Sequence, residues 1–302
     1  MIQEGDILAF VTVRNEIDRL PYFLSHYRKL GIAHFFMVDN GSNDGTTEYL
    51  GTQTDVSLWH TRASYKRSRF GVDWLTGLQM RYGHGHWCLT VDADEILVYQ
   101  DFERRSLSDV SRSLEAAGKD SFAALMLDMY PKSHLSKATH KAGHDPFSDL
   151  CWFDSGPYRV TMQTRLRNPW VQGGVRDRLF FQGQPERAPT LNKIPFVKWN
   201  WRYTYVSSTH SALPRRLNDA YGKGRAEVET GVLLHSKFLN SIIDKSREEK
   251  MRQEHFANSK LYDAYYDGLI EDPVLWTENS VRYAGWRQLI DLGLMAGQQD
   301  TD

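Results

Sequence analysis

The stretch WCLTVDADEILVY, residues Trp87–Tyr99, is an apolar run that breaks into three carboxylates and then turns apolar again. The residues before the acids have the character of a buried β-strand, and Asp92, Asp94 and Glu95 follow within four positions. Three like charges so close together repel one another, so something should compensate for that repulsion. The segment therefore predicts a buried strand with a functional site at its carboxyl end.

Outward from this stretch, apolar runs alternate with helical patterns over the first 128 residues. The predicted strands are 7–13, 34–40, 56–60, 87–92 and 122–128, and the predicted helices are 17–31, 44–50, 72–83 and 107–118. Apolar strands separated by helices are typical of a mostly parallel sheet that is covered on both faces. We therefore predict an α/β fold with a Rossmann-type sheet and a C-terminal helical extension.

The second half of the chain mixes strand and helix patterns. Strands are expected over 158–167 and 175–182, where apolar and polar residues alternate, and helices over 238–268. We expect this half to complete the sheet and to add helices around an opening. The predicted domains are a nucleotide-sugar-binding and catalytic domain over 1–237 and a helical region over 238–302 that packs on it.

Composition restricts the class of protein. The 302 residues are 41% hydrophobic and 25% charged, and a formal net charge of -1 gives no basic field for nucleic acid. Two cysteines, Cys88 and Cys151, make no disulfide framework and fit a reducing compartment. No apolar run approaches the roughly 18 residues of a membrane span, and the first residues lack a signal-peptide pattern. We expect a cytoplasmic protein, for which peripheral contact with the inner membrane stays open.

Polar residues stand where the predicted strands end, and ligands of open parallel sheets bind at the carboxyl ends of the strands. They are Arg14, Asn15 and Glu16 after the first strand, Asp39 and Asn40 at the second, Asp92, Asp94 and Glu95 at the fourth, and Asp128 at the fifth. Asp39, Asn40 and Gly41 are also residue types that turns favour, so a turn without a binding role explains their presence equally well. Taken together, the strand ends predict one site along one edge of the sheet.

The spacing of Asp92 and Asp94 indicates a metal site. Residues i and i+2 of an extended strand point to the same side, so we expect both carboxylates to face one way and Ala93 the other. Such hard oxygen ligands suit Mg²⁺ or Mn²⁺, which keep coordination positions open for substrate phosphates. The alternative is a pair of solvated carboxylates in a turn.

The segment FVTVRNEIDRLPYFLSHYRKLGIAHFFMVDNGSNDGTTEYL, residues 10–50, together with VDADE at 91–95, resembles bacterial family 2 glycosyltransferases of the GT-A fold. Further segments that match are 173–180, 192–199, 207–210 and 232–239, so the resemblance covers most of the chain. It implies metal-dependent, inverting transfer from a nucleotide-sugar donor, with UDP-sugars favoured, to a hydroxyl of a saccharide or glycolipid acceptor. It also suggests a role in surface polysaccharide or glycoconjugate synthesis.

For the donor, the resemblance implies a pocket at the end of the first strand. The residues assigned to it are Val13, Arg14, Asn15 and Glu16, with Asp39 on the nucleoside and Asp92 and Ala93 near the ribose. Lys237, or a basic residue of TRASYKRSRF (61–70) such as Arg69, would support the diphosphate. A solvated basic loop explains that stretch equally well.

For the metal, the resemblance implies Asp94 as the principal ligand with Asp92 beside it. In several GT-A enzymes a late histidine completes the metal site, and His235 is the candidate here, with His210 as the competitor. A hydrogen-bonded structural role explains either histidine equally well.

Inversion requires a carboxylate that takes the acceptor proton on the opposite face of the sugar. Family 2 enzymes often place this aspartate in a Glu-Asp pair well after the Asp-x-Asp, and the sequence has no such pair in that context. The candidates are Asp177, Asp128 and Glu95, with Asp177 preferred.

Three other classes compete with this interpretation. A nucleotidyltransferase should carry a glycine-rich phosphate loop after the first strand, where TVRNEIDRLP has no glycine. A catalytically silent nucleotide-binding or scaffold protein of the same fold should have lost Asp92 or Asp94, and both are present. A metal-dependent phosphate-ester hydrolase stays open, and an acceptor screen would separate it from a transferase.

Overall fold

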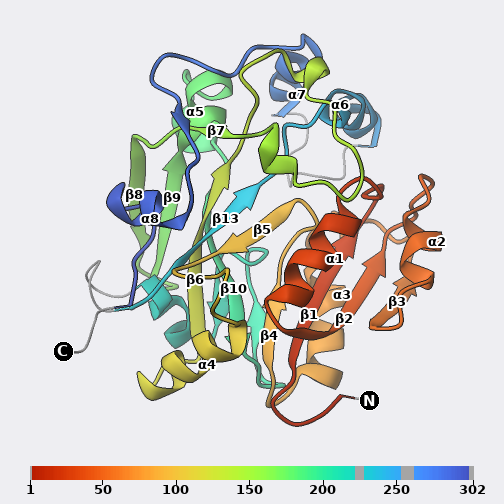
Figure 1. Cartoon of the computed structure of the whole chain (residues 1–302), viewed down its shortest axis with the longest axis vertical. Helices are drawn as coiled ribbons and strands as arrows, with labels where there is room; N and C mark the ends of the chain where they lie inside the picture. Colours follow the sequence, from red (N-terminus) through yellow and green to blue (C-terminus); the bar gives the residue numbers. More distant parts are fainter. Residues whose placement is uncertain (1, 222–227, 253–261, 299–302) are drawn as a thin grey trace.

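An eight-stranded sheet forms the centre of the computed structural model, which describes residues 2–221, 228–252 and 262–298 (Figure 1). The strand order is β3-β2-β1-β4-β10-β6-β13-β5. The strands are β1 Ile7–Val13, β2 Ile32–Asp39, β3 Val56–His60, β4 Trp87–Thr90, β5 Glu95–Val98, β6 Ser121–Asp128, β10 Asn192–Lys198 and β13 Gly231–His235. The second half of the chain thus completes the sheet, as predicted.

Most of the strands are parallel. β1 pairs in parallel with β2 and β4, β2 with β3, and β6 with β13. β10 lies antiparallel between β4 and β6, and β5 lies antiparallel to β13 at the edge. Because only β10 and β5 run against the other six strands, the carboxyl ends of those six meet at one edge of the sheet, where the site was predicted.

Helices cover both faces of the sheet. On one face, α1 Leu20–Lys29 and α4 Leu107–Ala116 pack in the same core as Ala9 of β1. On the other face, α3 Val72–Leu78 packs with the next residue of the strand, Phe10. Alternate side chains of a strand point to opposite faces, so the continuous apolar run of β1 contributes to two cores. The predicted α/β fold with helices on both faces is confirmed.

Three further helices lie beyond the carboxyl ends of the strands, at the top of Figure 1. They are α5 Gly174–Phe180, α6 Ser241–Arg252 and α7 Asp263–Ile270. Their apolar residues share a third cluster with Tyr130 and Phe238, which follow β6 and β13. This matches the helical region predicted at 238–268 in its described part, whereas the domain boundary at 237/238 stays a prediction.

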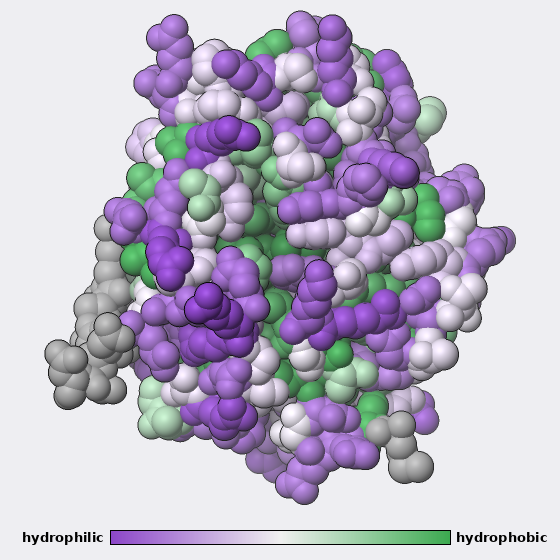
Figure 2. Space-filling model, in the orientation of Figure 1, coloured by the Kyte–Doolittle hydropathy of each residue, from purple (hydrophilic) through white to green (hydrophobic). Residues whose placement is uncertain are grey.

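The remaining elements are short. The helices are α2 Thr46–Gly51 and α8 Trp286–Asp291, a π-helical turn η1 Gln79–Gly83, and the 3₁₀ turns η2 Leu135–Lys137, η3 Pro146–Ser148, η4 Pro185–Arg187 and η5 Arg215–Tyr221. The strands are β7 Trp152–Phe153, β8 Tyr158–Gln163, β9 Asn168–Gly173, β11 Thr204–Tyr205, β12 Ala212–Leu213 and β14 Val281–Arg282. Hydrophilic side chains dominate the face seen in Figure 2, with hydrophobic ones in separate small groups. None of the described helices is long and apolar enough to cross a membrane.

One predicted strand is a helix. The alternation over 175–182 predicts extended backbone, but the chain forms α5 there, and that prediction is wrong. Gly174, at φ +71°, adopts the left-handed conformation that starts the helix after β9. The helix buries Val175 in the third cluster and carries Arg176 to Asp128, so tertiary contacts override the local pattern.

The acidic segment is a turn. β4 ends at Thr90, and the Glu95 N–H donates to the Asp92 carbonyl at 3.0 Å before β5 begins. The expectation that Asp92 and Asp94 share one side of an extended strand is therefore wrong. The turn leaves the Asp92 side chain 50% exposed and that of Asp94 21% exposed.

Candidate functional site

A cavity of about 990 Å³ opens at the carboxyl ends of the parallel strands. Its wall includes Thr12–Glu16 at the end of β1, the whole Asp92–Glu95 turn, and His235 at the end of β13. Residues of α6 and of the loop after β3 line it as well, so segments that are far apart in the sequence enclose one space. The structure therefore brings the predicted strand-end residues of β1 and β4 together with His235, the candidate that the family resemblance implied.

Charged side chains dominate the cavity wall. Among the described residues, ten basic and seven acidic side chains line it, in a chain whose formal net charge is -1. The basic ones are Arg14, Arg19, Lys66, Arg69, Arg176, Arg187, Lys193, Lys237, Lys245 and Arg252, and the acidic ones are Glu16, Asp92, Asp94, Glu95, Glu186, Glu248 and Glu249. A concave site with an excess of positive charge favours an anionic ligand.

His235 lies between two carboxylates. Its Nδ1 is 2.6 Å from Oδ1 of Asp128, and its Nε2 is 3.1 Å from Oδ2 of Asp94. Burial alone would lower the pKa of His235, but the charges and hydrogen bonds of the two carboxylates raise it above its ordinary value. Burial would likewise raise the pKa of Asp94, and His235, Arg19 and Lys237 together bring it well below its usual range. The described geometry thus favours an imidazolium paired with carboxylates.

Asp128 orients this histidine from behind. Its Oδ1 accepts from His235, and its Oδ2 accepts from Nε of Arg176 at 2.7 Å. Burial would raise the pKa of Asp128, but Arg176 and His235 lower it to about 2. Both oxygens are occupied and the side chain does not line the cavity, so the structure places Asp128 behind the site rather than against a ligand.

Lys193 of β10 compensates the acidic turn. Its Nζ lies 3.2 Å from Oδ2 of Asp92 and 2.9 Å from Oε1 of Glu95, and its side chain is only 4% exposed. Burial would lower the pKa of Lys193, but these two carboxylates raise it. Burial raises the pKa of Glu95, with the lysine charge opposing it. In the described structure, Lys193 and His235 thus compensate for the repulsion among the three acids, for which the sequence suggested a divalent ion.

Lys237 contributes a cation without a carboxylate partner. Within the described part of the chain, its ammonium makes no ion pair, although it lines the cavity and is partly buried. Burial lowers the pKa of Lys237, and the charge of Asp94 opposes that effect. A desolvated ammonium without a partner is costly, so its position favours a bound anion.

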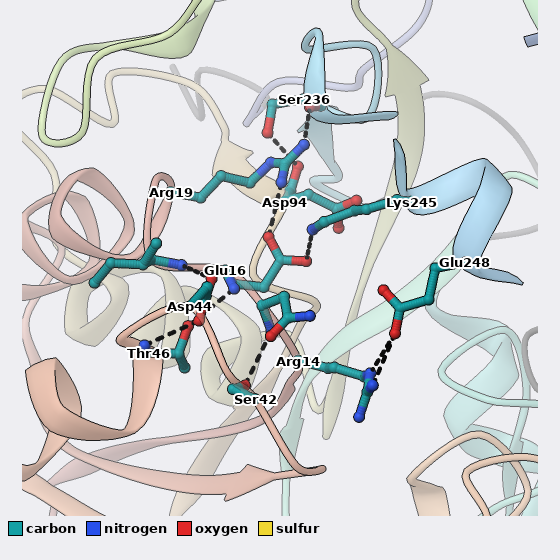
Figure 3. A network of polar contacts seen from close by, with 12 residues as sticks. Arg14, Glu16, Arg19, Ser42, Asp44, Thr46, Asp94, Ser236, Lys245 and Glu248 are labelled. Carbon is teal, nitrogen blue, oxygen red and sulfur yellow. Dashed lines mark hydrogen bonds and ion pairs between the residues drawn. The ribbon is translucent and has the colours of Figure 1, made fainter. Parts of the chain in front are cut away.

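Ion pairs join α6 to the end of β1 beside the cavity, as Figure 3 shows. Nη2 of Arg14 lies 2.7 Å from Glu248, and Glu16 accepts from Lys245 at 2.5 Å and from Arg19 at 2.8 Å. The residues predicted for the donor pocket after β1 therefore line the cavity. Their charged groups are already engaged with partners from α1 and α6.

Asp39 does not line the cavity. Its carboxylate accepts from the Ser42 N–H at 3.1 Å, from the Ser42 hydroxyl at 2.5 Å and from the Thr47 hydroxyl at 3.0 Å. The neighbouring Asn40 lines the cavity instead. The structure gives Asp39 the role of a turn residue, which was the alternative explanation of its motif, and does not bring it to the predicted nucleoside pocket.

Asp177, the preferred candidate for the base, also lies away from the cavity. Both of its oxygens accept from Arg159, at 2.6 and 2.9 Å. Arg69 lines the cavity, but its guanidinium is bound to Asp73 and to the Tyr205 carbonyl. The structure therefore places Asp177 apart from the other predicted site residues that line the cavity.

The two candidate histidines occupy different parts of the wall. His235 contacts Asp94, whereas His210 is hydrogen-bonded through Nδ1 to the Asn192 carbonyl at 2.6 Å. Burial lowers the pKa of His210 to about 3, and its ring lies 6.3 Å from that of Trp170. Across residues 2–221, 228–252 and 262–298, no three His, Cys, Asp or Glu side chains are grouped so that they could hold a metal ion.

Comparison with known proteins does not assign a family to the chain. No family model matches it, and no curated protein matches it. Among solved structures it is similar to a 4-diphosphocytidyl-2C-methyl-D-erythritol synthase, with 18% identity, 47% of this chain and 69% of that chain covered, and a TM-score of 0.27.

Two further solved structures show a similar degree of likeness. HddC from Yersinia pseudotuberculosis is 7% identical over 72% of this chain and 80% of that chain, with a TM-score of 0.31. A protein from Bacillus anthracis assigned as a glucose-1-phosphate thymidylyltransferase is 9% identical over 89% of this chain and 84% of that chain, with a TM-score of 0.31. Likeness of this extent assigns neither activity nor substrate to the chain.

Proposed function

We propose that the protein is a glycosyltransferase that moves a sugar, with inversion, from a nucleotide-sugar donor to an acceptor hydroxyl. The observation that carries the proposal is the unpaired Lys237 in a positively charged cavity beside the Asp94–His235 pair. A donor diphosphate would supply the missing anion for this ammonium. The sequence resemblance to family 2 glycosyltransferases supports the same conclusion independently.

We propose that Asp94 and His235 would hold a divalent metal ion, Mn²⁺ or Mg²⁺. Asp128 accepts the Nδ1 hydrogen of His235, and Nε2, which faces Asp94, would be the ligand atom once its proton has left. The half-exposed carboxylate of Asp92 lines the same cavity and could add an oxygen.

When bound, the ion would supply Lewis-acid stabilisation of the leaving diphosphate. Residues of the chain would bind and orient the other groups. Lys237 binds a phosphate oxygen, and Asp128 accepts the Nδ1 hydrogen of His235 and so holds the tautomer in which Nε2 is free to bind the ion. Lys193 holds the acidic turn in place by pairing with Asp92 and Glu95.

We propose a UDP-sugar as the donor. Both amide hydrogens of Asn40 are donated to the carbonyls of Thr61 and Ala63, so Asn40 offers a ligand only its oxygen, an acceptor. The buried Thr12 hydroxyl also lines the cavity and has no hydrogen-bond partner in the described chain. An acceptor beside a hydroxyl donor suits the N–H and C=O edge of uracil. The ring pair of Tyr65 and Phe70, 5.9 Å apart, offers an aromatic wall for the base.

The acceptor and the biological role belong to the same proposal. A saccharide or glycolipid acceptor, in the cytoplasm or at the inner membrane, and a place in surface polysaccharide or glycoconjugate synthesis are supported by the sequence resemblance. A catalytically silent nucleotide-binding protein is the second candidate. The pairing of Asp92 with Lys193 and of Asp94 with His235 favours it, because both carboxylates are satisfied without a metal.

Calorimetry with UDP and with uridine tests the diphosphate assignment. Lys237→Met should weaken UDP binding about tenfold, the value of one charge-assisted contact of roughly 1.4 kcal/mol, and should leave uridine binding unchanged. Lys132→Met is the control, since Lys132 lies outside the cavity and stacks on Trp276. Equal loss of UDP and uridine in Lys237→Met, or no loss of either, would remove the phosphate role from Lys237.

A further inference from the structure

Six of the seven carboxylates that line the cavity have a cationic partner. The paired ones are Glu16 with Arg19, Asp92 and Glu95 with Lys193, Asp94 with His235, Glu248 with Arg14, and Glu249 with Arg252. Of the acids described on this wall, Glu186 alone makes no ion pair, and the residue is exposed. A cationic partner occupies the oxygens of a carboxylate, so among these acids Glu186 is the one whose oxygens are open to a ligand hydroxyl.

The backbone around Glu186 is held by three side chains from elsewhere in the fold. Arg159 donates to the Pro185 carbonyl at 3.0 Å, and Tyr262 donates to the Arg187 carbonyl at 3.0 Å. The side-chain amide of Gln172 donates to the carbonyls of the residues before and after Arg187, which are Glu186 at 3.1 Å and Ala188 at 2.5 Å. Four successive carbonyls, 185–188, in and just after the 3₁₀ turn η4, are thus fixed, while the Glu186 carboxylate makes no ion pair in the described chain. This is the arrangement that a preorganised reactive group requires.

An aromatic surface accompanies this carboxylate. Trp170 and Gln172 are two residues apart on β9, so their side chains leave the strand on the same face. Gln172 bonds to the turn of Glu186, and Trp170 lines the cavity, half-buried, beside His210. An apolar ring face and an unpaired carboxylate on the same cavity wall suit a molecule with one flat apolar face and hydroxyls at its edge, which describes a pyranose.

We propose that this part of the wall is the acceptor subsite, with Glu186 as the general base and Trp170 as the stacking surface, an assignment that rests on the proposed transferase function. The acceptor hydroxyl gives its proton to Glu186 as its oxygen forms a bond to the anomeric carbon. The bond from that carbon to the diphosphate oxygen breaks, and its electron pair leaves with the nucleoside diphosphate. Glu186 then returns the proton to solvent.

This assignment differs from the bases predicted from sequence. Asp177 lies outside the cavity and is bound to Arg159, and both oxygens of Asp128 are occupied. Glu95 is fully buried against Lys193. None of the three can meet an acceptor hydroxyl in the described arrangement.

The test measures UDP release from UDP-glucose, UDP-galactose and UDP-N-acetylglucosamine, with p-nitrophenyl glycosides as acceptors and with water alone. Glu186→Gln should lower kcat about a hundredfold or more, the usual contribution of a general base, with the donor KM and the UDP affinity unchanged. The fall of kcat/KM at low pH should disappear in this variant, and formate should restore part of the activity of Glu186→Ala. Glu278→Gln, an exposed glutamate outside the cavity, should behave as the wild type.

Trp170→Ala should raise the KM for the acceptor more than tenfold with a smaller effect on UDP affinity. If wild-type protein turns over and Glu186→Gln keeps more than a third of kcat, or loses kcat with an unchanged pH profile, Glu186 is not the base. If wild-type protein neither binds UDP nor releases it from any donor, the proposed function itself is overturned. Binding of UDP by both proteins, with turnover by the wild type alone, supports the assignment.

Discussion

Replacement of Lys193 by methionine tests how the acidic turn is held. The ammonium, 4% exposed, is 2.9 Å from a fully buried Glu95 and 3.2 Å from Asp92. Methionine fills a similar volume but leaves the Glu95 carboxylate buried without its partner. Removing one member of a buried pair costs about 3–5 kcal/mol of unfolding free energy, and we expect that loss near neutral pH.

The loss of unfolding free energy in Lys193→Met should depend on pH. Burial already raises the pKa of Glu95, and loss of Lys193 removes the charge that opposes this effect. With a folded-state pKa above the unfolded value, the variant regains stability as the pH falls and Glu95 takes up a proton. The stability deficit should therefore be smaller at pH 5 than at pH 8.

Urea unfolding at the two pH values measures both effects. Lys198→Met is the matched control, because Lys198 lies on the same strand and pairs with Glu115 at 2.8 Å, with side chains 41% and 44% exposed. An exposed pair contributes about 0–1 kcal/mol. Equal losses in the two variants, or a Lys193→Met deficit that grows toward pH 5, would refute the role given to Lys193.

Three further predictions follow from other contacts. Asp128→Asn should weaken Mn²⁺-dependent UDP binding about 10–100-fold through loss of the histidine tautomer, whereas Asp177→Asn should leave calorimetric affinity unchanged. Burial lowers the pKa of His26 to about 4, below its value in the unfolded chain. As the pH falls, the unfolded chain therefore takes up a proton at His26 before the folded protein does, and the unfolding free energy decreases. His26 should contribute about 2 kcal/mol to the fall of the wild-type unfolding free energy between pH 7 and 5, and the fall in a His26→Gln variant should be smaller by this amount. Glu248→Gln should change stability by less than about 1 kcal/mol, since its pair with Arg14 is partly exposed at 33% and 29%; a larger loss in urea would show that α6 depends on this contact.

The first half of the fold could be predicted because its signals are local. β1, β2, β3, β4 and β6 are apolar runs bounded by polar residues, and the helices between them carry one apolar face. The antiparallel insertion of β10 could not be predicted in this way, because strand order depends on contacts between distant segments. The alternation at 175–182 was misleading for the same reason, since the buried pair of Arg176 with Asp128 stabilises a helix there.

Part of the cavity wall was predicted from the sequence. Asp92, Asp94, His235 and Lys237 meet at one cavity because strand ends gather at one edge of a parallel sheet. Lys193 was missed, although a lysine inside the apolar stretch NKIPFV is a signal of a buried charge partner. The sequence around Glu186 has no signal of this kind. Its proposed role rests on hydrogen bonds to its backbone and on the ion pairs of the other described acids of the cavity wall, and both depend on the fold.

Titration calorimetry of wild-type protein and Asp94→Asn with UDP, with and without Mn²⁺, tests the central claim most directly. The account predicts that wild-type protein binds UDP, that Mn²⁺ strengthens this binding, and that Asp94→Asn loses the metal-dependent part while keeping a folded spectrum. Failure of wild-type protein to bind UDP under either condition would contradict the account, as would binding in Asp94→Asn that Mn²⁺ strengthens to the same degree.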